Sequence, residues 1–143
     1  MDLFVYGTLM VPRVMEAVCG YAQPGVAAVL PNHRCRLVNG EVYPAIVPKQ
    51  GEQVNGLVYR NLSDQELEQL DRFEGDMYRR GRVDIVIDRQ TTTAQTYLLA
   101  AAFRQLLSDT PWDLEHFMVD GIQYFIAGYD GFSRATVGAN PDD

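Results

Sequence analysis

The sequence predicts an α+β fold built on a mixed, mainly antiparallel sheet that curls or closes into a small β-barrel with flanking helices. Two observations predict this class. Short apolar or β-branched segments recur between Pro, Asn and Gly residues, and helical periodicity occurs in only three places. The sequence also lacks the regular alternation of strand and helix that a doubly wound parallel sheet requires. We expect one domain, residues 1–143, because domains commonly contain about 100–150 residues.

The N-terminal part is expected to form a strand, a turn and a helix. An apolar run covers residues 3–6 and ends at Gly7. Pro12 suits the first turn of a helix that continues to Val18, and Gly20 follows it. The next four apolar or β-branched pieces predict short strands of a meandering sheet: residues 25–30, 34–38, 45–47 and 54–60.

A second helix is expected between Ser63 and Gly75. Ser63 and Glu66 match a capping box, in which each side chain bonds to the backbone N–H of the other residue. Glycine is favoured just after the last turn of a helix, where Gly75 stands. The apolar positions between them follow at helical spacing: Leu67, Leu70 and Phe73.

The rest of the chain predicts an antiparallel hairpin and a third helix. Val83, Ile85 and Ile87 occupy alternate positions of one strand, and a second strand covers residues 92–99. Thr110 and Pro111 are expected to open the helix. Its apolar residues should pack one face on the core: Leu114, Phe117, Met118, Ile122, Phe125 and Ile126.

Composition argues against several classes of partner. Twelve Lys and Arg residues against nineteen Asp and Glu give a net charge of −7, which repels phosphate backbones and anionic membranes, so we expect neither nucleic acid nor a membrane as partner. No run approaches the roughly 20 apolar residues needed to span a bilayer, and Asp2 stands where a secretory signal is basic. We expect a cytoplasmic protein. Cys19, Cys35, His33 and His116 lack metal-ligand spacing, so no metal site is expected.

The turn formed by Tyr6, Gly7, Thr8 and Leu9 is a candidate anion site. It follows a buried strand and precedes a helix, so successive backbone N–H groups can point at one carboxylate or developing oxyanion. A purely structural interpretation is also open, in which Gly7 only permits a tight turn and Tyr6 fills the core.

Glu74 is a candidate acid or base. It lies at the predicted C-terminal end of a helix, where the helix dipole disfavours negative charge, and Asp71 and Asp76 add like charges nearby. A raised pKa is therefore expected if the carboxyl group is also removed from water. The alternative is a solvated acid at a helix end, with Arg79 or Arg80 as a surface neighbour.

Taken together, these segments resemble the γ-glutamyl cyclotransferase-like family, including its AIG2-like branch. The resemblance covers nearly the whole chain and depends on the order and spacing of four motifs. They are Phe4-Val5-Tyr6-Gly7-Thr8-Leu9, Tyr43-Pro44-Ala45-Ile46, Val54-Asn55-Gly56-Leu57-Val58-Tyr59, and Leu70-Asp71-Arg72-Phe73-Glu74-Gly75 followed by Tyr78 and Arg80.

The resemblance implies a β-barrel with flanking helices and no cofactor. It implies that the turn from Tyr6 to Leu9 binds a small γ-glutamyl substrate and that Glu74 is the catalytic acid and base. In the implied reaction, the α-amine of a γ-glutamyl amino acid or γ-glutamylamine attacks its own γ-carbonyl group, which releases the attached amine and leaves 5-oxoproline. A non-catalytic module that binds a γ-glutamyl or similar acidic ligand is the alternative.

Several points stay open at the level of sequence. The turn amides can serve either the α-carboxylate or the oxyanion of the substrate. Tyr78 either donates a hydrogen bond to substrate, orients Glu74, or is a half-buried strand residue. The sequence does not identify the leaving amine, the physiological role or the oligomeric state.

Overall fold

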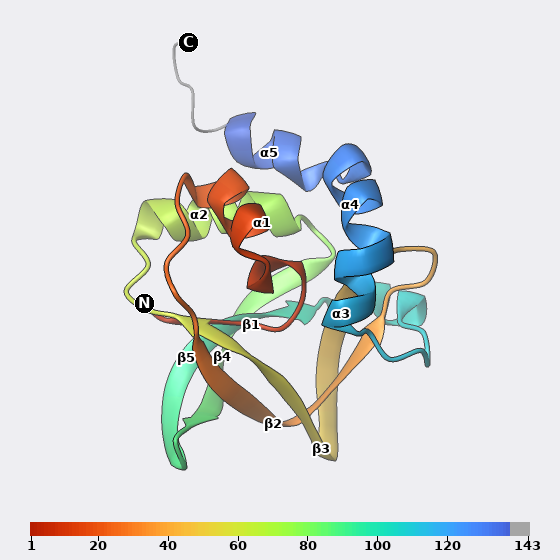
Figure 1. Cartoon of the computed structure of the whole chain (residues 1–143). Coiled ribbons are helices and arrows are strands. Elements are labelled where there is room, and N and C mark those ends of the chain that lie inside the picture. The colour runs from red at the N-terminus through yellow and green to blue at the C-terminus, as the bar shows by residue number, and fades with distance from the viewer. Residues whose placement is uncertain (138–143) are drawn as a thin grey trace.

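The computed structural model describes residues 1–137 and confirms the predicted α+β class. Five strands close into a barrel in the order β1-β3-β2-β4-β5, and helices cover one end and one side of it (Figure 1). Neighbouring strands are antiparallel except for the short parallel pairing of β1 with β5. The strands are β1 Leu3–Val5, β2 Val26–Leu37, β3 Pro44–Tyr59, β4 Tyr78–Ile87 and β5 Gln90–Leu99.

The four short strands expected between residues 25 and 60 are in fact two long ones, β2 and β3, so this prediction was wrong. Pairing continues along both strands and only changes register between Pro31 and His33. Asn32 takes a positive φ of 59° at this point, Gly51 takes 87°, and the Gly51 N–H donates to Asn32 Oδ1 over 3.1 Å. Pro31, Asn32 and Gly51 therefore form a bulge within one ladder, whereas Asn39 and Gly40 lie in the loop between β2 and β3.

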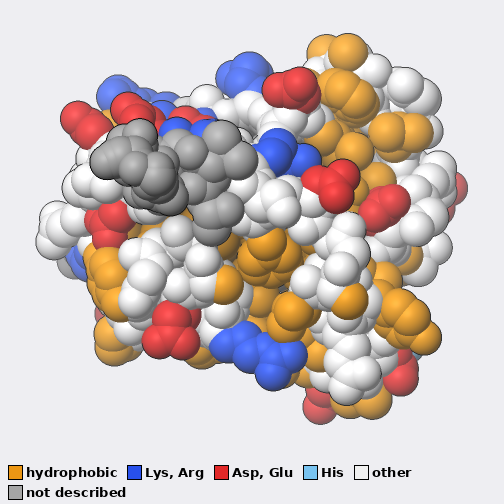
Figure 2. Space-filling model, turned by 90° about the horizontal axis from the view of Figure 1, so that it is seen from above, with side chains coloured by type: hydrophobic (Ala, Val, Ile, Leu, Met, Phe, Trp, Pro, Cys, Tyr) orange, Lys and Arg blue, Asp and Glu red, His pale blue; other side chains and the backbone are white. Residues whose placement is uncertain are grey.

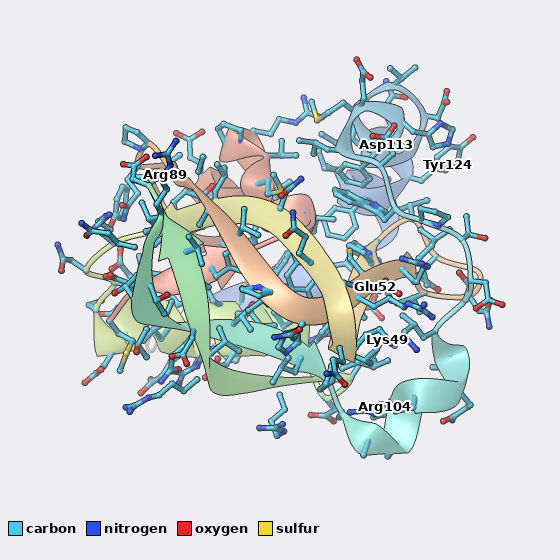
Figure 3. The ribbon with its side chains drawn as sticks, turned by 90° about the horizontal axis from the view of Figure 1, so that it is seen from below. Lys49, Glu52, Arg89, Arg104, Asp113 and Tyr124 are labelled. Carbon is cyan, nitrogen blue, oxygen red and sulfur yellow. The ribbon has the colours of Figure 1, made fainter. Side chains whose placement is uncertain are left out.

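The expected second helix and the expected hairpin are confirmed. Helix α2, Asp64–Glu74, begins with the reciprocal capping box of Ser63 and Glu66, with bonds of 3.1 and 2.8 Å. It ends at Gly75, where φ is 81°. Strands β4 and β5 pair from Tyr78 opposite Leu99 to Ile87 opposite Gln90. Arg89 lies in the turn that joins them, at one tip of the barrel (Figure 3).

The other helical elements are shorter. The predicted first helix is α1, Pro12–Cys19, which ends at Gly20 with a φ of 88°. A single turn, η1, precedes it over Thr8–Met10, and a second short element, η2, covers Ala101–Leu106.

The C-terminal helix differs from the prediction. It begins at Leu114, capped by Asp113, rather than at Thr110 and Pro111. A π-helical turn interrupts it, giving α3 Leu114–His116, η3 Phe117–Gly121 and α4 Ile122–Gly128, with α5 Gly131–Val137 after them. Phe117, Ile122 and Phe125 are buried as expected, but Met118 and Ile126 are 45% and 41% exposed. Hydrophobic side chains show on the side of the molecule where α3 and α4 lie (Figure 2), and Tyr124 points outward from α4 (Figure 3).

The core has two main parts, and β1 contributes to both. Phe4 and Tyr6 pack inside the barrel, whereas Leu3 and Val5 pack on the helices, because side chains alternate along a strand. This arrangement fixes the direction in which the chain leaves β1 and enters the turn at Gly7. No helix within residues 1–137 is long and apolar enough to cross a membrane.

The close approach of the paired strands β1 and β3 requires a glycine at position 56. A Cβ atom there would overlap the Val5 carbonyl oxygen and lie 2.7 Å from the Phe4 ring. We predict that Gly56→Ala lowers the free energy of unfolding by about 1–3 kcal/mol or more, because neither neighbour can move without breaking the β1–β3 ladder. Gly128→Ala is the matched control, since a Cβ atom at that position would meet no neighbour within 4 Å. Equal urea midpoints for the two variants would contradict this account.

Candidate active site

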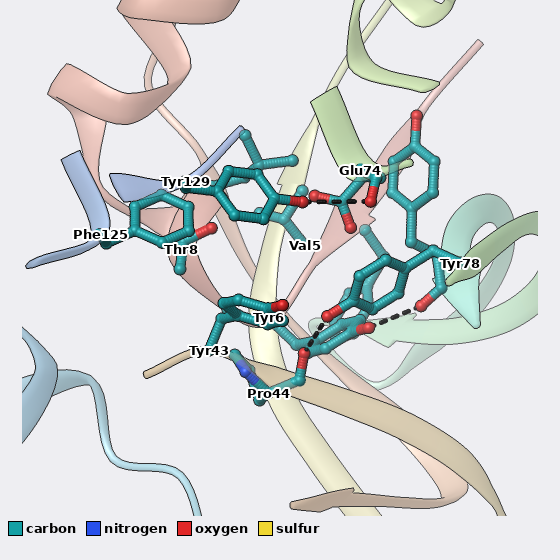
Figure 4. Close-up of a pocket in the computed structure, with 13 residues that line it drawn as sticks. Val5, Tyr6, Thr8, Tyr43, Pro44, Glu74, Tyr78, Phe125 and Tyr129 are labelled. Carbon is teal, nitrogen blue, oxygen red and sulfur yellow. Dashed lines mark hydrogen bonds between the residues drawn. The ribbon is translucent and has the colours of Figure 1, made fainter. Parts of the chain in front are cut away.

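One pocket brings together the residues that the sequence predicted separately. Its walls come from several segments (Figure 4). They are the turn after β1, the start of β3, the end of α2, the strands β4 and β5, and α4 with the residue that follows it. The empty space of the pocket is about 390 Å³ when the open solvent at its mouth is included. All six predicted site residues line it: Tyr6, Gly7, Thr8, Leu9, Glu74 and Tyr78. Its other lining residues are Phe4, Val5, Tyr43, Pro44, Tyr97, Phe125 and Tyr129.

The turn after β1 lines this pocket and contains backbone donors without an acceptor among residues 1–137. Within the described part of the chain, the N–H groups of Gly7, Thr8 and Leu9 have no hydrogen-bond acceptor. The turn is held by the Tyr59 hydroxyl, which donates to the Leu9 carbonyl over 2.7 Å. Gly7 is needed for close packing here, because a Cβ atom would lie 2.8 Å from Pro44 Cγ. The turn is therefore fixed in shape and rich in unused donors.

The two predicted tyrosines donate their hydroxyl protons to backbone carbonyl groups. Tyr6 donates to Tyr97 over 2.6 Å, and Tyr78 donates to Pro44 over 2.7 Å. Burial raises the pKa of both phenols well above the ordinary value, so both stay neutral. Since each phenol has one proton, Tyr78 does not donate to Glu74 in this structure; its oxygen can still accept a bond.

Glu74 lies at the last position of α2. The residue is half-buried, and its side chain lies among the aromatic residues of the pocket (Figure 4). Burial raises the pKa of this carboxyl from 4.5 to about 8; the charge of Arg134 lowers it, and that of Asp71 raises it further. Desolvation is the dominant cause, because it disfavours the ionised form most strongly. At neutral pH Glu74 is thus mostly a neutral acid that can reach its ionised form.

Asp71, the like charge expected beside Glu74, belongs to a separate polar network. It accepts hydrogen bonds from Arg80 Nε over 2.8 Å and from the Tyr97 hydroxyl over 2.7 Å. Arg80 also donates to Gln95. The network links Asp71, near the C-terminal end of α2, to β4 and β5. It therefore holds this end of the helix against the barrel. Asp76, the other expected like charge, is exposed.

Sequence reasoning missed four residues around Glu74. Tyr43, Phe125, Tyr129 and Arg134 come from the loop before β3 and from the C-terminal helices. Tyr43 lies within one of the four motifs, but the motif alone gives it no role. Periodicity predicts Phe125 only as core, and its spacing of four residues from Tyr129 was the available signal for a shared helix face.

A wider groove joins the pocket to the surface. It contains about 1330 Å³ of empty space and shares five lining residues with the inner pocket, Glu74 among them. Three further acidic residues line it, Glu41, Asp76 and Asp130, against the single cation Arg134. Within residues 1–137, no group of three or more His, Cys, Asp or Glu side chains could hold a metal ion.

Comparison with known proteins connects this geometry to a family. Residues 3–114 match the family model described as gamma-glutamyl cyclotransferase, AIG2-like. AIG2-like protein D of Arabidopsis thaliana is 34% identical over 118 residues, which is 80% of this chain and 76% of that protein. AIG2-like protein C of the same plant is 42% identical over 87 residues, 60% of this chain, and the match spans only 50% of its length.

Solved structures show the same fold. A solution structure of an Arabidopsis thaliana protein superposes with a TM-score of 0.67 at 26% identity, covering 99% of this chain and 93% of that one. A structure of a gamma-glutamyl cyclotransferase superposes with a TM-score of 0.62 at 20% identity, covering 69% and 66%. With the pocket and the matched motifs in view, the chain belongs to the gamma-glutamyl cyclotransferase, AIG2-like family.

Proposed function

We propose that this chain is a cyclotransferase that converts a γ-glutamyl amino acid or a γ-glutamylamine to 5-oxoproline and a free amine. The α-amine nitrogen attacks the γ-carbonyl carbon of the same molecule, a C–N bond forms, and the C–N bond to the leaving amine breaks. One observation carries the proposal: a desolvated carboxyl group, Glu74, shares a pocket with a turn of unused backbone donors. This combination provides a proton acceptor and an anion site within reach of one small ligand.

The pKa of Glu74 suits this proton transfer. Peptide α-amino groups have a pKa of about 7.7–8.0, and the free α-carboxylate of the substrate raises the pKa of its amine. The value of about 8 for Glu74 therefore lies much nearer to the pKa of the attacking amine than the ordinary 4.5 does. Proton transfer between groups of similar pKa is nearly balanced in free energy, so Glu74 can take the proton of the attacking amine and return one to the leaving amine. An ordinary exposed glutamate is a far weaker base. Both reacting groups belong to one substrate, so no covalent intermediate with the protein is needed.

The turn amides support the anionic parts of the reaction. Negative charge develops on the γ-carbonyl oxygen during attack, and the substrate also carries an α-carboxylate. The N–H groups of Gly7, Thr8 and Leu9 are suited to either anion, because they are fixed in place before the substrate arrives. The phenol oxygen of Tyr78 remains available as an acceptor, which suits the ammonium form of the substrate.

The outer groove is the natural place for the leaving amine. Its acidic residues outnumber its single cation, so a neutral or cationic leaving group is favoured there over an acidic one. The aromatic side chains of Tyr43, Tyr124 and Tyr129 add apolar contact surface. This charge pattern favours γ-glutamylamines and neutral γ-glutamyl amino acids as substrates.

A module that only binds a γ-glutamyl ligand is the second candidate. The free turn donors favour it as much as they favour the enzyme, whereas the raised pKa of the half-buried Glu74 does not. A binding module gains nothing from a desolvated carboxyl group whose ionisation is disfavoured. Incubation with a panel of γ-glutamyl compounds separates the two, because only the enzyme releases amine and 5-oxoproline.

We predict that Glu74→Gln lowers kcat by at least about 10²-fold, because the amide keeps the shape of the side chain but cannot exchange a proton. Released amine and 5-oxoproline are the measured products. Glu68→Gln is the control, since Glu68 is an exposed residue of the same helix and should keep full activity. Full activity in Glu74→Gln would reject Glu74 as acid and base.

A second prediction needs no substrate. The folded protein holds a proton on Glu74 up to a pKa of about 8, whereas the unfolded chain loses it near 4.5. The stability of the wild type relative to Glu74→Gln should therefore fall as pH rises from about 4.5 to 8, by on the order of a few kcal/mol, since one pKa unit corresponds to about 1.4 kcal/mol. Urea unfolding at pH 5 and pH 8 measures this change. A difference between the two proteins that does not vary with pH would show that Glu74 is not desolvated.

A further inference from the structure

Helix α5 lies outside the family match, yet it reaches the end of α2 that carries Glu74. The match ends at residue 114, and α5 covers Gly131–Val137. Figure 1 shows α5 above α2, and the two helices pack together. Arg134 of α5 makes polar contact with α2. Its Nε donates to the Arg72 carbonyl over 2.9 Å, and its Nη2 donates to the Phe73 carbonyl over 3.1 Å.

These bonds serve backbone groups that a helix cannot satisfy alone. The last four carbonyl groups of an α-helix lack partners within the helix. Arg134 supplies donors to two carbonyls at the end of α2. The single proton of the Tyr129 hydroxyl is shared between the carbonyls of Phe73 and Glu74, at 2.8 and 3.1 Å. The Arg134 guanidinium also lies 5.5 Å from the centre of the Tyr129 ring, on which it stacks as a cation. The last turn of α2 is thus held by the C-terminal segment.

Arg134 also has the only positive charge among the groups that act on the Glu74 carboxyl in the described part of the chain. Asp71 is the like charge on the same helix, and its own charge is balanced by Arg80. The other titratable groups of the inner pocket are neutral phenols: Tyr6, Tyr43, Tyr78, Tyr97 and Tyr129. The outer groove, which Glu74 and Arg134 also line, adds the carboxyl groups of Glu41, Asp76 and Asp130. Desolvation raises the pKa of Glu74, and the charge of Arg134 lowers it.

We propose that Arg134 is a positioning residue of this site, which fixes the end of α2 through backbone bonds and keeps the ionised form of Glu74 accessible through its charge. This inference rests on the proposed function for its kinetic consequence, but not for its electrostatic one. It makes the C-terminal helices part of the working site, although the family match ends before them. The guanidinium acts on Glu74 and not on the reacting atoms.

The kinetic test compares three variants across pH. Arg134→Gln should raise the lower midpoint of the kcat profile by about half a unit to one unit, because Glu74 loses the charge that favours its ionised form. At pH 7 this lowers kcat by about threefold to tenfold, with KM changed less than about twofold. Arg134→Lys restores the charge and should restore the midpoint. Arg79→Gln removes an equal charge from an exposed residue and should leave the midpoint unchanged. An unmoved midpoint in Arg134→Gln, or an equal movement in Arg79→Gln, overturns the proposal.

A substrate-free test separates this inference from the proposed function. The pKa of the Glu74 carboxyl can be read from its ¹³C NMR shift in labelled protein, with Glu74→Gln identifying the signal. Arg134 is exposed, so salt should screen its charge and raise this pKa in the wild type, and this measurement holds even if Arg134→Gln fails to fold. A pKa that neither salt nor Arg134→Gln moves supports no role for the charge and overturns the inference. A shift of the Glu74 pKa in a protein that does not turn over γ-glutamyl compounds would instead contradict only the proposed reaction.

Discussion

The removal of one carboxyl group from water is the constraint on which the site depends. Glu74 would be more stable in solvent, and its raised pKa measures how strongly the fold disfavours its charge. Aromatic packing at the end of α2 offsets this cost: Phe73, Phe125, Tyr129 and Phe132 form one cluster, mostly edge to face. Phe125 and Tyr129 of this cluster line the pocket of Glu74. The same rings exclude water, so the feature that destabilises the charge also defines the pocket. Stability and reactivity therefore come from one set of contacts.

The barrel matters because it holds two unrelated chain segments in register. Side chains of β1 pack alternately in the barrel interior and on the helices, and this packing fixes the direction of the turn that follows β1. The position of Glu74 is fixed by the C-terminal end of α2. The Asp71 network fixes α2 against β4 and β5, which are the strands next to β2 and β1 in the barrel. A shift of either segment would separate the turn amides from the carboxyl. Closure of the sheet thus brings Gly7 and Glu74 into the same pocket.

Local signals predicted well what is determined locally. The capping box of Ser63 and Glu66 and the stop at Gly75 are short-range bonds, so α2 and the position of Glu74 were predictable from sequence. The long ladder of β2 and β3 was not, because Asn32 and Gly51 form a bulge only when the two strands face each other. Tyr129 and Arg134 were missed for the same reason, since their partners on α2 lie more than 50 residues away.

The irregular C-terminal helix gives a geometric reason for the exposure of Met118. In a regular helix, Met118 would share a face with Ile122, four positions later. The π turn over Phe117–Gly121 adds one residue, and each added residue rotates the following chain by about 100° relative to the preceding turn. Met118 is thereby turned toward solvent, while Ile122, Phe125 and Tyr129 face the barrel. Because Tyr129 must reach the carbonyl groups of Phe73 and Glu74, the exposure of Met118 follows from the same shift that completes the wall around the carboxyl.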